Sequence, residues 1–279
     1  MKFLFALNLL LAALMYGLPA HAITDEGAPL QIVNSEIKDG VLEVTVDAGT
    51  KGDVPERVTL LTQRGQGYVH AELIDKQRSC ELLCGDDQPQ TCHVVAIYKA
   101  KIAGYVGQVY AALPYLAQIS KQEVIDPLQH PSRLPKNLRG HVGKTVFTPM
   151  YPNDLALRLQ GWDFDTDSVL FDYKYKGSEG PFEAARVPGC GIFGQDRFLN
   201  VDCGDNLSLM FEDDHLLLVS FADYGRAVAK ILLGFEMNGK RQYLVRIGLK
   251  SEEVIGLLEP DESGGWILRL RPADYPKMC

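Results

Sequence analysis

Residues 207–221 read LSLMFEDDHLLLVSF and carry the plainest structural signal in the chain. Two apolar runs flank Asp213-Asp214, and a two-residue turn at this pair predicts a β-hairpin. In that hairpin, Phe211 would face Leu216 and Leu209 would face Leu218. The apolar pattern and the turn agree, which predicts an antiparallel sheet in this part of the chain.

A second hairpin is predicted around Asn238-Gly239 in residues 231–249, which read ILLGFEMNGKRQYLVRIGL. Asn-Gly favours a two-residue turn that places Phe235 opposite Gln242. A loop one residue longer places Phe235 opposite Tyr243 and buries a more apolar face, because a slip of one residue exchanges the two faces of a strand. We therefore expect the longer loop, with a β-bulge beside the turn.

Short apolar runs bounded by turn residues continue outward from these hairpins and indicate further strands. In the C-terminal half they recur about every ten residues. Near the N-terminus, Asp39-Gly40 separates two such runs and residues 63–67 separate two more, so both pairs are expected to form hairpins. The chain is therefore expected to be mainly β, with antiparallel strands arranged as a sandwich or a barrel.

One or two short helices are expected in the middle of the chain. Between Tyr105 and Ile119, apolar residues recur at helical spacing, although Pro114 interrupts the pattern. Ser120 followed by Glu123 has the spacing of a capping box. This spacing predicts a second short helical turn.

The first 22 residues have the composition of a secretory signal peptide. Lys2 precedes a long apolar run, and Ala20-His21-Ala22 supplies the small residues of a cleavage site. The run is too short and wrongly flanked for a membrane span, and no later segment reaches spanning length. We expect a mature chain that begins near Ile23 and is exported to the periplasm or the medium. The sequon Asn206-Leu207-Ser208 keeps a eukaryotic secretory pathway open as an alternative.

Prolines divide the expected mature chain into two units. Residues 127–152 hold five prolines and four Lys or Arg residues, with no acidic residue between Asp126 and Asp154. Such a composition is typical of a segment that crosses the surface rather than of a core element. We expect a β-rich N-terminal domain at 23–126, this basic crossing segment at 127–152, and an antiparallel β domain at 153–279.

Six cysteines follow the expected cleavage site, and an even number in an oxidising compartment favours three disulfides. Cys190 and Cys203 have no nearer competitor and are therefore expected to pair with each other. Closing a loop of this size stabilises a chain by about 3 kcal/mol, because it restricts the unfolded state.

The other four cysteines allow three pairings. Cys84 and Cys92 flank a polar, turn-rich segment and are expected to pair, which leaves Cys80 to bond Cys279. A zinc site is the alternative, but Cys-x3-Cys-x7-Cys-His lacks the usual paired spacing of zinc ligands. The bond between Cys80 and Cys279 is expected only because the pairing of Cys84 with Cys92 leaves these two cysteines.

Acidic residues are unevenly distributed along the chain. The formal net charge is −8, and residues 152–223 alone hold 14 acidic and 5 basic residues. Nucleic acid is not an expected partner, because phosphate recognition needs a basic surface. A protein with a basic surface is the expected partner, with Asp213 and Asp214 as contact residues. The alternative is a solubility surface on which the basic crossing segment lies.

Residues 162–167 read WDFDTD and contain a candidate calcium site. Carboxylates with the alternate spacing of a calcium-binding loop occur at Asp163, Asp165 and Asp167. The match ends there, because Ser168 replaces the turn glycine and Lys174 replaces the bidentate glutamate. The alternative is a strand start with acidic side chains outward and with Trp162 and Phe164 inward. No cofactor is expected, with calcium as the one alternative.

Common catalytic motifs do not occur in the chain. Gly-x-Ser-x-Gly, His-Glu-x-x-His, a phosphate-binding loop and a dinucleotide fingerprint are all absent from the sequence. We therefore expect an exported, non-catalytic binding or inhibitor-like protein that recognises its partner through the acidic C-terminal region. Two alternatives stay open. One is an exported hydrolase with its site between the two halves, and the other is an envelope assembly module whose strand edges pair with other chains.

Overall fold

The computed structural model describes residues 23–49, 53–63, 67–81, 91–125, 142–143, 155–175, 179–195, 197–204, 207–213, 215–221, 227–249, 252–260, 262 and 266–271. These residues form strands and no helix, so the expectation of a mainly β protein is confirmed. The strands build four sheets, and every strand pair except one is antiparallel. The predicted signal peptide, residues 1–22, lies outside the described residues.

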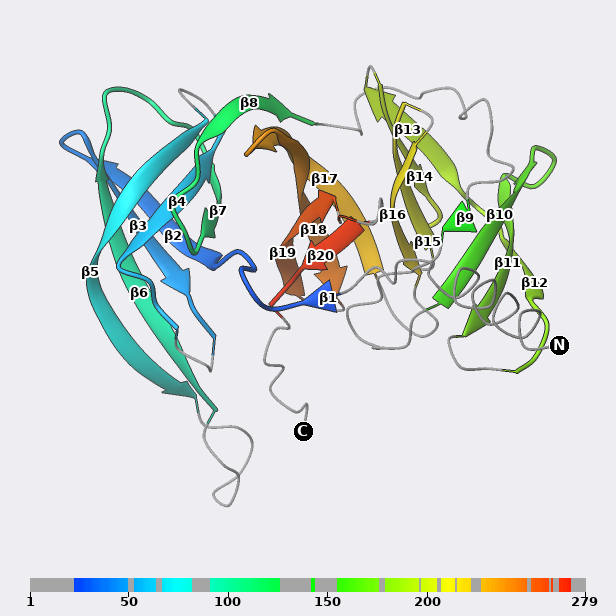
Figure 1. Ribbon diagram of the computed structural model, residues 1–279, viewed down its shortest axis with the longest axis horizontal. Helices are drawn as coiled ribbons and strands as arrows, with labels where there is room; N and C mark the ends of the chain where they lie inside the picture. The colour runs from blue at the N-terminus through cyan, green and yellow to red at the C-terminus, as the bar shows by residue number, and fades with distance from the viewer. Residues whose placement is uncertain are drawn as a thin grey trace, which may run out of the picture.

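The four sheets follow one another along the long axis of the molecule (Figure 1). The barrel contains, in spatial order, β2 (Gln31–Lys38), β3 (Val41–Asp47), β6 (Thr91–Lys101), β5 (Tyr68–Glu81), β4 (Arg57–Thr62) and β7 (Val109–Leu113). The central sheet contains β1 (Ile23–Thr24), β20 (Trp266–Arg269), β19 (Glu252–Pro260), β18 (Lys240–Leu249), β17 (Ala227–Met237) and β8 (Ile119–Val124).

Two smaller sheets complete the stack. The third sheet contains β13 (Gly191–Gln195), β14 (Phe198–Asp202), β15 (Leu207–Glu212) and β16 (His215–Phe221). The outer sheet contains β12 (Glu183–Val187), β11 (Ser168–Tyr175), β10 (Leu155–Asp163) and β9 (Val142–Gly143).

The barrel is almost closed around its own apolar core. The backbone of Leu30, just before β2, pairs with Ala112 of β7, which brings the two edge strands of the sheet together. Alternate residues of each strand point inward, as Leu42, Val44 and Val46 of β3 do. This period of two, which the sequence shows, gives the barrel a filled interior.

Three further apolar layers hold the sheets together. The first lies between the barrel and the central sheet, and it includes Leu61 and Leu113 on one side and Phe235 and Leu244 on the other. The second joins the opposite face of the central sheet to the third sheet. The third joins the third sheet to the outer sheet. The central and third sheets are therefore buried on both faces, so their strands are apolar at consecutive positions.

Both ends of the predicted N-terminal domain leave the barrel. β1 pairs with β20, and β8 pairs with β17, so the central sheet combines strands from both halves of the chain. Of the predicted crossing segment 127–152, only the short strand β9 is described. The domain boundaries at 126 and 153 stay a prediction.

The Asp213-Asp214 hairpin forms, but its register slips beyond the second pair. Glu212 faces His215 and Phe211 faces Leu216, as the sequence predicts. Leu209 faces Val219 rather than Leu218, because a bulge falls between Met210 and Phe211. A slip in a sheet that is buried on both faces exchanges one apolar residue for another, so the sequence pattern does not resist it.

The longer loop predicted at Asn238-Gly239 is wrong. Both residues have positive φ angles, 53° and 72°, and form the two-residue turn that Asn-Gly favours. Phe235 therefore faces Gln242, and the bulge lies at Leu232 instead of beside the turn. The turn chemistry outweighs the apolar pattern, and as a result Gln242 is buried on the face of β18 that also carries Leu244.

The predicted helices are absent from the described residues, which hold β7 and β8 in their place. β7 lies between the barrel interior and the central sheet, so Val109 and Ala112 face one layer and Ala111 and Leu113 face the other. A strand buried on both faces imitates helical spacing. No helix among the described residues is long and apolar enough to cross a membrane.

The cysteine pairing confirms one expected disulfide and corrects another. Cys190 and Cys203 are bonded across the ends of β13 and β14. Cys92 is bonded to Cys80 instead of Cys84, because β5 continues to Glu81 and places Cys80 directly opposite Cys92. The predicted bond between Cys80 and Cys279 is therefore also wrong. Cys84 and Cys279 themselves lie outside the described residues.

A glutamine side chain locks the barrel to the central sheet. The amide of Gln31, at the start of β2, donates to the carbonyl oxygen of Ile255 over 3.0 Å. Its oxygen accepts a hydrogen bond from the Ile255 backbone N–H, also over 3.0 Å. The side chain thus pairs with β19 as a neighbouring strand would.

Replacing Gln31 with Leu is expected to lower the free energy of unfolding by about 1–3 kcal/mol, because both backbone groups of Ile255 lose their partner in a partly buried layer. The shift in the midpoint of urea denaturation measures this effect. Gln118→Leu on an exposed loop is the control and should change the free energy by less than about 0.5 kcal/mol. Equal shifts for the two variants would contradict the role of Gln31.

Non-reducing peptide mapping of the purified protein tests the disulfides. We expect cross-linked peptides that join Cys80 to Cys92 and Cys190 to Cys203. A peptide joining Cys84 to Cys92 would contradict the hairpin register of β5 and β6.

Candidate binding surface

The turn between β10 and β11 presents an exposed aromatic side chain. Asp163 faces Ser168 at the end of the hairpin, and residues 164–167 form the turn. Phe164 is 75% exposed, whereas Trp162 packs against the layer between the third and outer sheets. The alternative in which both aromatic residues face inward is therefore correct for Trp162 and wrong for Phe164.

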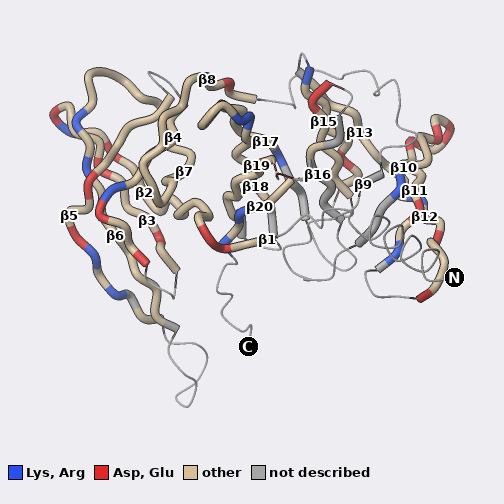
Figure 2. Tube along the Cα trace, in the orientation of Figure 1, with Lys and Arg blue, Asp and Glu red and all other residues tan. Residues whose placement is uncertain are grey.

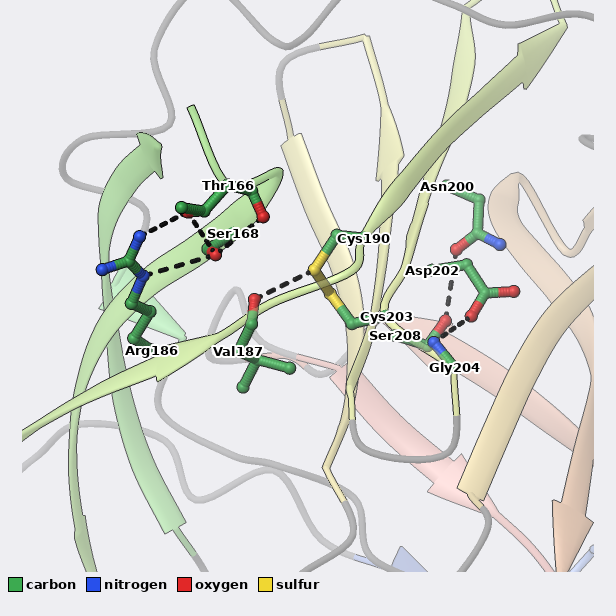
Figure 3. The surroundings of a disulfide bond; sticks show 10 residues. All are labelled: Thr166, Ser168, Arg186, Val187, Cys190, Asn200, Asp202, Cys203, Gly204 and Ser208. Carbon is green, nitrogen blue, oxygen red and sulfur yellow. Dashed lines mark hydrogen bonds between the residues drawn. A yellow bond between two sulfur atoms is a disulfide. The ribbon is translucent and has the colours of Figure 1, made fainter. Parts of the chain in front are cut away.

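An arginine from the neighbouring strand holds this turn in place. Arg186 of β12 donates to the Asp163 carboxylate and to the hydroxyl of Thr166. Its Nε also lies 3.4 Å from the Ser168 hydroxyl, which is itself fully buried (Figure 3). Thr166 and Ser168 are joined by a hydrogen bond of 2.7 Å between their hydroxyls. Hydrogen bonds from Arg186 and between the two hydroxyls therefore hold the turn in one conformation.

A disulfide braces the turn from the other side. The backbone N–H of Cys190 donates to the carbonyl oxygen of Asp167 over 2.8 Å. Cys190 is bonded to Cys203, which follows β14, so the brace links the outer sheet to the third sheet (Figure 3). Asp167 has a φ of 44°, a left-handed conformation that Asp and Asn tolerate better than most residues.

The carboxylate of Asp163 is stabilised in its charged form. Hydrogen bonding from the Thr166 hydroxyl lowers its pKa most, followed by the backbone N–H of Asp165, and Arg186 adds an attractive charge. The backbone N–H of Asp165 lies 3.0 Å from the Asp163 carboxylate. This carboxylate is engaged within the turn, whereas the side chains of Asp165 and Asp167 have no hydrogen bond or ion pair with a described residue.

The calcium hypothesis requires Asp163, Asp165 and Asp167 to converge. Among the described residues no group of three His, Cys, Asp or Glu side chains is placed to hold a metal ion. Asp163 binds Arg186 instead, and the other two carboxylates point to solvent from an exposed turn. Figure 2 shows acidic residues gathered at this tip of the outer sheet.

The second acidic candidate lies at the β15–β16 turn. Asp213 is exposed with a φ of 52°, and its backbone N–H donates to the carbonyl oxygen of Arg197 over 2.7 Å. Asp214 lies outside the described residues. The structure therefore does not bring Asp213 together with the β10–β11 turn in any described contact.

Part of the acidic excess is neutralised inside the molecule. Glu212 lies 2.9 Å from the guanidinium of Arg197 and 3.9 Å from Arg241. Both arginines also contact Glu123 of β8, so the network ties the central sheet to the third sheet. Burial raises the pKa of Glu212, while the arginines act in the opposite direction. The acidic surface is thus smaller than the residue count implies.

Two features of the turn were not predicted from the sequence. Phe164 points outward from the turn at residues 164–167, and Arg186, which lies 18 residues after Ser168, reaches the turn from β12. The contact with Arg186 depends on the pairing of β11 with β12, which no short stretch of sequence shows.

No protein family, curated protein or solved structure matches the chain.

Thr166→Val is expected to raise the pKa of Asp163 more than Arg186→Gln does, because the hydroxyl hydrogen bond is the larger cause of the depression. Side-chain carboxyl NMR during a pH titration measures this difference. Since the folded pKa is depressed, the stabilisation from Asp163 is present above its unfolded pKa and is lost as pH falls through the folded pKa. Thr45→Val on the barrel should leave the Asp163 titration unchanged, and a larger rise in Arg186→Gln would contradict the assignment.

Proposed function

We propose that the chain is an exported, non-catalytic binding protein that recognises a basic protein partner through the β10–β11 turn. The observation that carries the proposal is an exposed aromatic residue, Phe164, set beside two free carboxylates on a turn that is held from both sides. The contact surface consists of Phe164, Asp165 and Asp167. We call it the acidic turn.

Aromatic residues on exposed, rigid elements supply a large share of binding energy in protein interfaces. Phe164 would enter an apolar pocket of the partner, and the two aspartates would pair with Lys or Arg side chains around it. Arg186 and the disulfide of Cys190 support this role, because a turn that is already ordered loses little entropy on binding.

Charge supports the choice of a basic partner. Asp165 and Asp167 face solvent, where carboxylates attract cations over a distance without a large desolvation cost. Such attraction speeds the encounter between partners and weakens with salt, because the Debye length shrinks to about 3 Å at 1 M. The acidic excess of residues 152–223 extends the same field.

Export is part of the proposal. Residues 1–22 have the pattern of a secretory signal, and two disulfides are typical of proteins in the periplasm or outside the cell. A partner would therefore be an envelope or extracellular protein. A signal-peptidase product beginning near Ile23, read by N-terminal sequencing of the exported protein, is the expected result.

Partner retention from an envelope extract tests the acidic turn. Phe164→Ala is expected to weaken retention of the captured protein at all salt concentrations by about tenfold or more, because it removes the apolar anchor. Asp165→Asn with Asp167→Asn is expected to weaken retention at low salt and to make little difference at 1 M. Asn keeps the shape of both side chains and tolerates the backbone of residue 167.

Asp39→Asn is the matched control, because Asp39 is an exposed turn aspartate with positive φ on the barrel. The captured protein is identified by mass spectrometry, and its affinity for each variant is then measured with the purified pair by surface plasmon resonance. If Phe164→Ala and the double variant retain the same protein as the wild type with equal affinity, the acidic turn is a solubility surface and the proposal fails.

A further inference from the structure

The far part of β5 has a strand partner on one side only. β6 pairs with β5 as far as Glu81, whereas the ladder with β4 ends at Glu72. One more backbone hydrogen bond, from the N–H of Leu73 to the carbonyl oxygen of Glu56 over 2.8 Å, follows on the β4 side. Residues 76–80 therefore lack a strand on that side in the part of the chain that the structure describes. We call this segment the free edge, and it lies where β5 and β6 extend together beyond the barrel (Figure 1).

The chain that precedes β4 leaves this side of β5 instead of continuing along it. The carbonyl oxygen of Pro55 accepts a hydrogen bond of 2.7 Å from the hydroxyl of Tyr98, a fully buried side chain of the barrel interior. Val54 packs against the same interior core. Because these two residues are directed towards the core, the position beside the free edge is left open.

Alternate residues of the free edge direct their backbone groups outward. Val94 of β6 bonds the residues that continue β3, with its N–H donating to Gly49 and its C=O accepting from Ala48. Both of its groups therefore point away from Arg78, which lies directly opposite on β5. In an antiparallel ladder this makes Arg78 direct its own N–H and C=O away from β6. The residues two positions before and after it do the same, because the two kinds of pair alternate.

One end of the free edge is closed by an aspartate. The Asp75 carboxylate accepts hydrogen bonds from the backbone N–H of Lys76 over 2.8 Å and from the side-chain amide of Gln77 over 3.0 Å. A β-bulge immediately precedes it. Bulges and charges of this kind limit unwanted pairing at sheet edges. The N–H groups of Arg78 and Cys80 are left for a further strand, together with the carbonyl groups of the same face of the edge.

The free edge is basic on one face. Lys76 and Arg78 lie opposite Ala96 and Val94, which contribute to the interior core of the barrel, so both cations are on the inner face of the sheet. Both are exposed, and neither side chain has an ion pair or hydrogen bond with another described residue. Figure 2 shows basic residues along this part of β5. An added strand would place two of its own side chains, two residues apart, beside these cations.

We infer that the free edge binds an extended acidic segment of a partner protein, which adds to the barrel as a further strand. Acidic residues at alternate positions of the segment pair with Lys76 and Arg78, and its backbone bonds the outward groups of Arg78 and Cys80. A second copy of this chain does not fit, because two-fold antiparallel pairing centred on the free edge would place Arg78 against Arg78. The free edge and the acidic turn belong to different sheets and bind different partners.

NMR titration of the purified protein with the peptide acetyl-Thr-Glu-Thr-Glu-Thr-amide tests this inference. We expect saturable shifts and slower hydrogen exchange at the backbone N–H groups of Arg78 and Cys80, because the peptide bonds them. Exchange at Gln77 should not change, since its N–H points towards β6. A peptide with lysine in place of both glutamates should bind about tenfold more weakly or less, because like charges then face each other.

N-methylated peptides separate strand addition from attraction between charges. Successive N–H groups of a strand point to opposite edges, so methylating the glutamate nitrogens blocks one edge of the peptide and methylating the threonine nitrogens blocks the other. We expect one methylated peptide to lose binding and the other to keep it, and the one that is lost reports the direction of the added strand. Equal effects of the two methylations would overturn the inference.

Substitutions on the free edge test the charge preference. Lys76→Gln and Arg78→Gln should each weaken the glutamate peptide about threefold, and Lys76→Glu with Arg78→Glu should reverse the preference in favour of the lysine peptide. Lys101→Gln, an exposed lysine elsewhere on the barrel, is the matched control and should leave affinity unchanged. Phe164→Ala should also leave it unchanged, so failure of the free edge and failure of the acidic turn are distinguishable.

Two results would each overturn the inference. One is the absence of saturable shifts at Arg78 and Cys80 up to about 10 mM glutamate peptide. The other is a charge-reversed variant that keeps the preference of the wild type. The amide spectrum of each variant shows that it is folded, so a change in affinity is read on the native barrel.

Discussion

The central sheet is buried on both faces, and the rest of the structure depends on this double burial. Phe235 and Leu244 face the barrel, while Tyr243 and Val245 face the third sheet. Each strand therefore contributes to two apolar layers at once. The hydrophobic effect acts across the whole stack, because removing one layer would expose the inner face of its neighbour. Apolar packing is not directional. The hydrogen bonds of Gln31 and the ion pairs of Glu212 add directional interactions between neighbouring sheets.

Sequence reasoning succeeded wherever one face of a strand is apolar or a turn has distinctive chemistry. The alternation in β3, the Asp39-Gly40 hairpin and the mainly β class all follow from local pattern. It failed where both faces of a strand are buried, because the apolar pattern then does not show which residues lie on the same face. β7 was mistaken for part of a helix for this reason, and the registers around Leu209 and Phe235 were misjudged for the same reason. Long-range packing determines these features, and it is not encoded in any short window.

The candidate surface was partly foreseeable. The acidic excess and the spacing of Asp163, Asp165 and Asp167 drew attention to the right turn. Two features depended on pairing between strands: the neutralisation of Asp163 by Arg186 and the brace through Cys190.

The position of β8 has a consequence for the order of synthesis. β8 ends at Val124, but its partner β17 does not begin until Ala227, so a ribosome or a translocon delivers the two strands at different times. The barrel strands are complete by Leu113 and can close first, while Leu61 and Leu113 keep an uncovered apolar patch until the last fifty residues emerge. A chain built in this way needs protection of its apolar surface until the central sheet is complete.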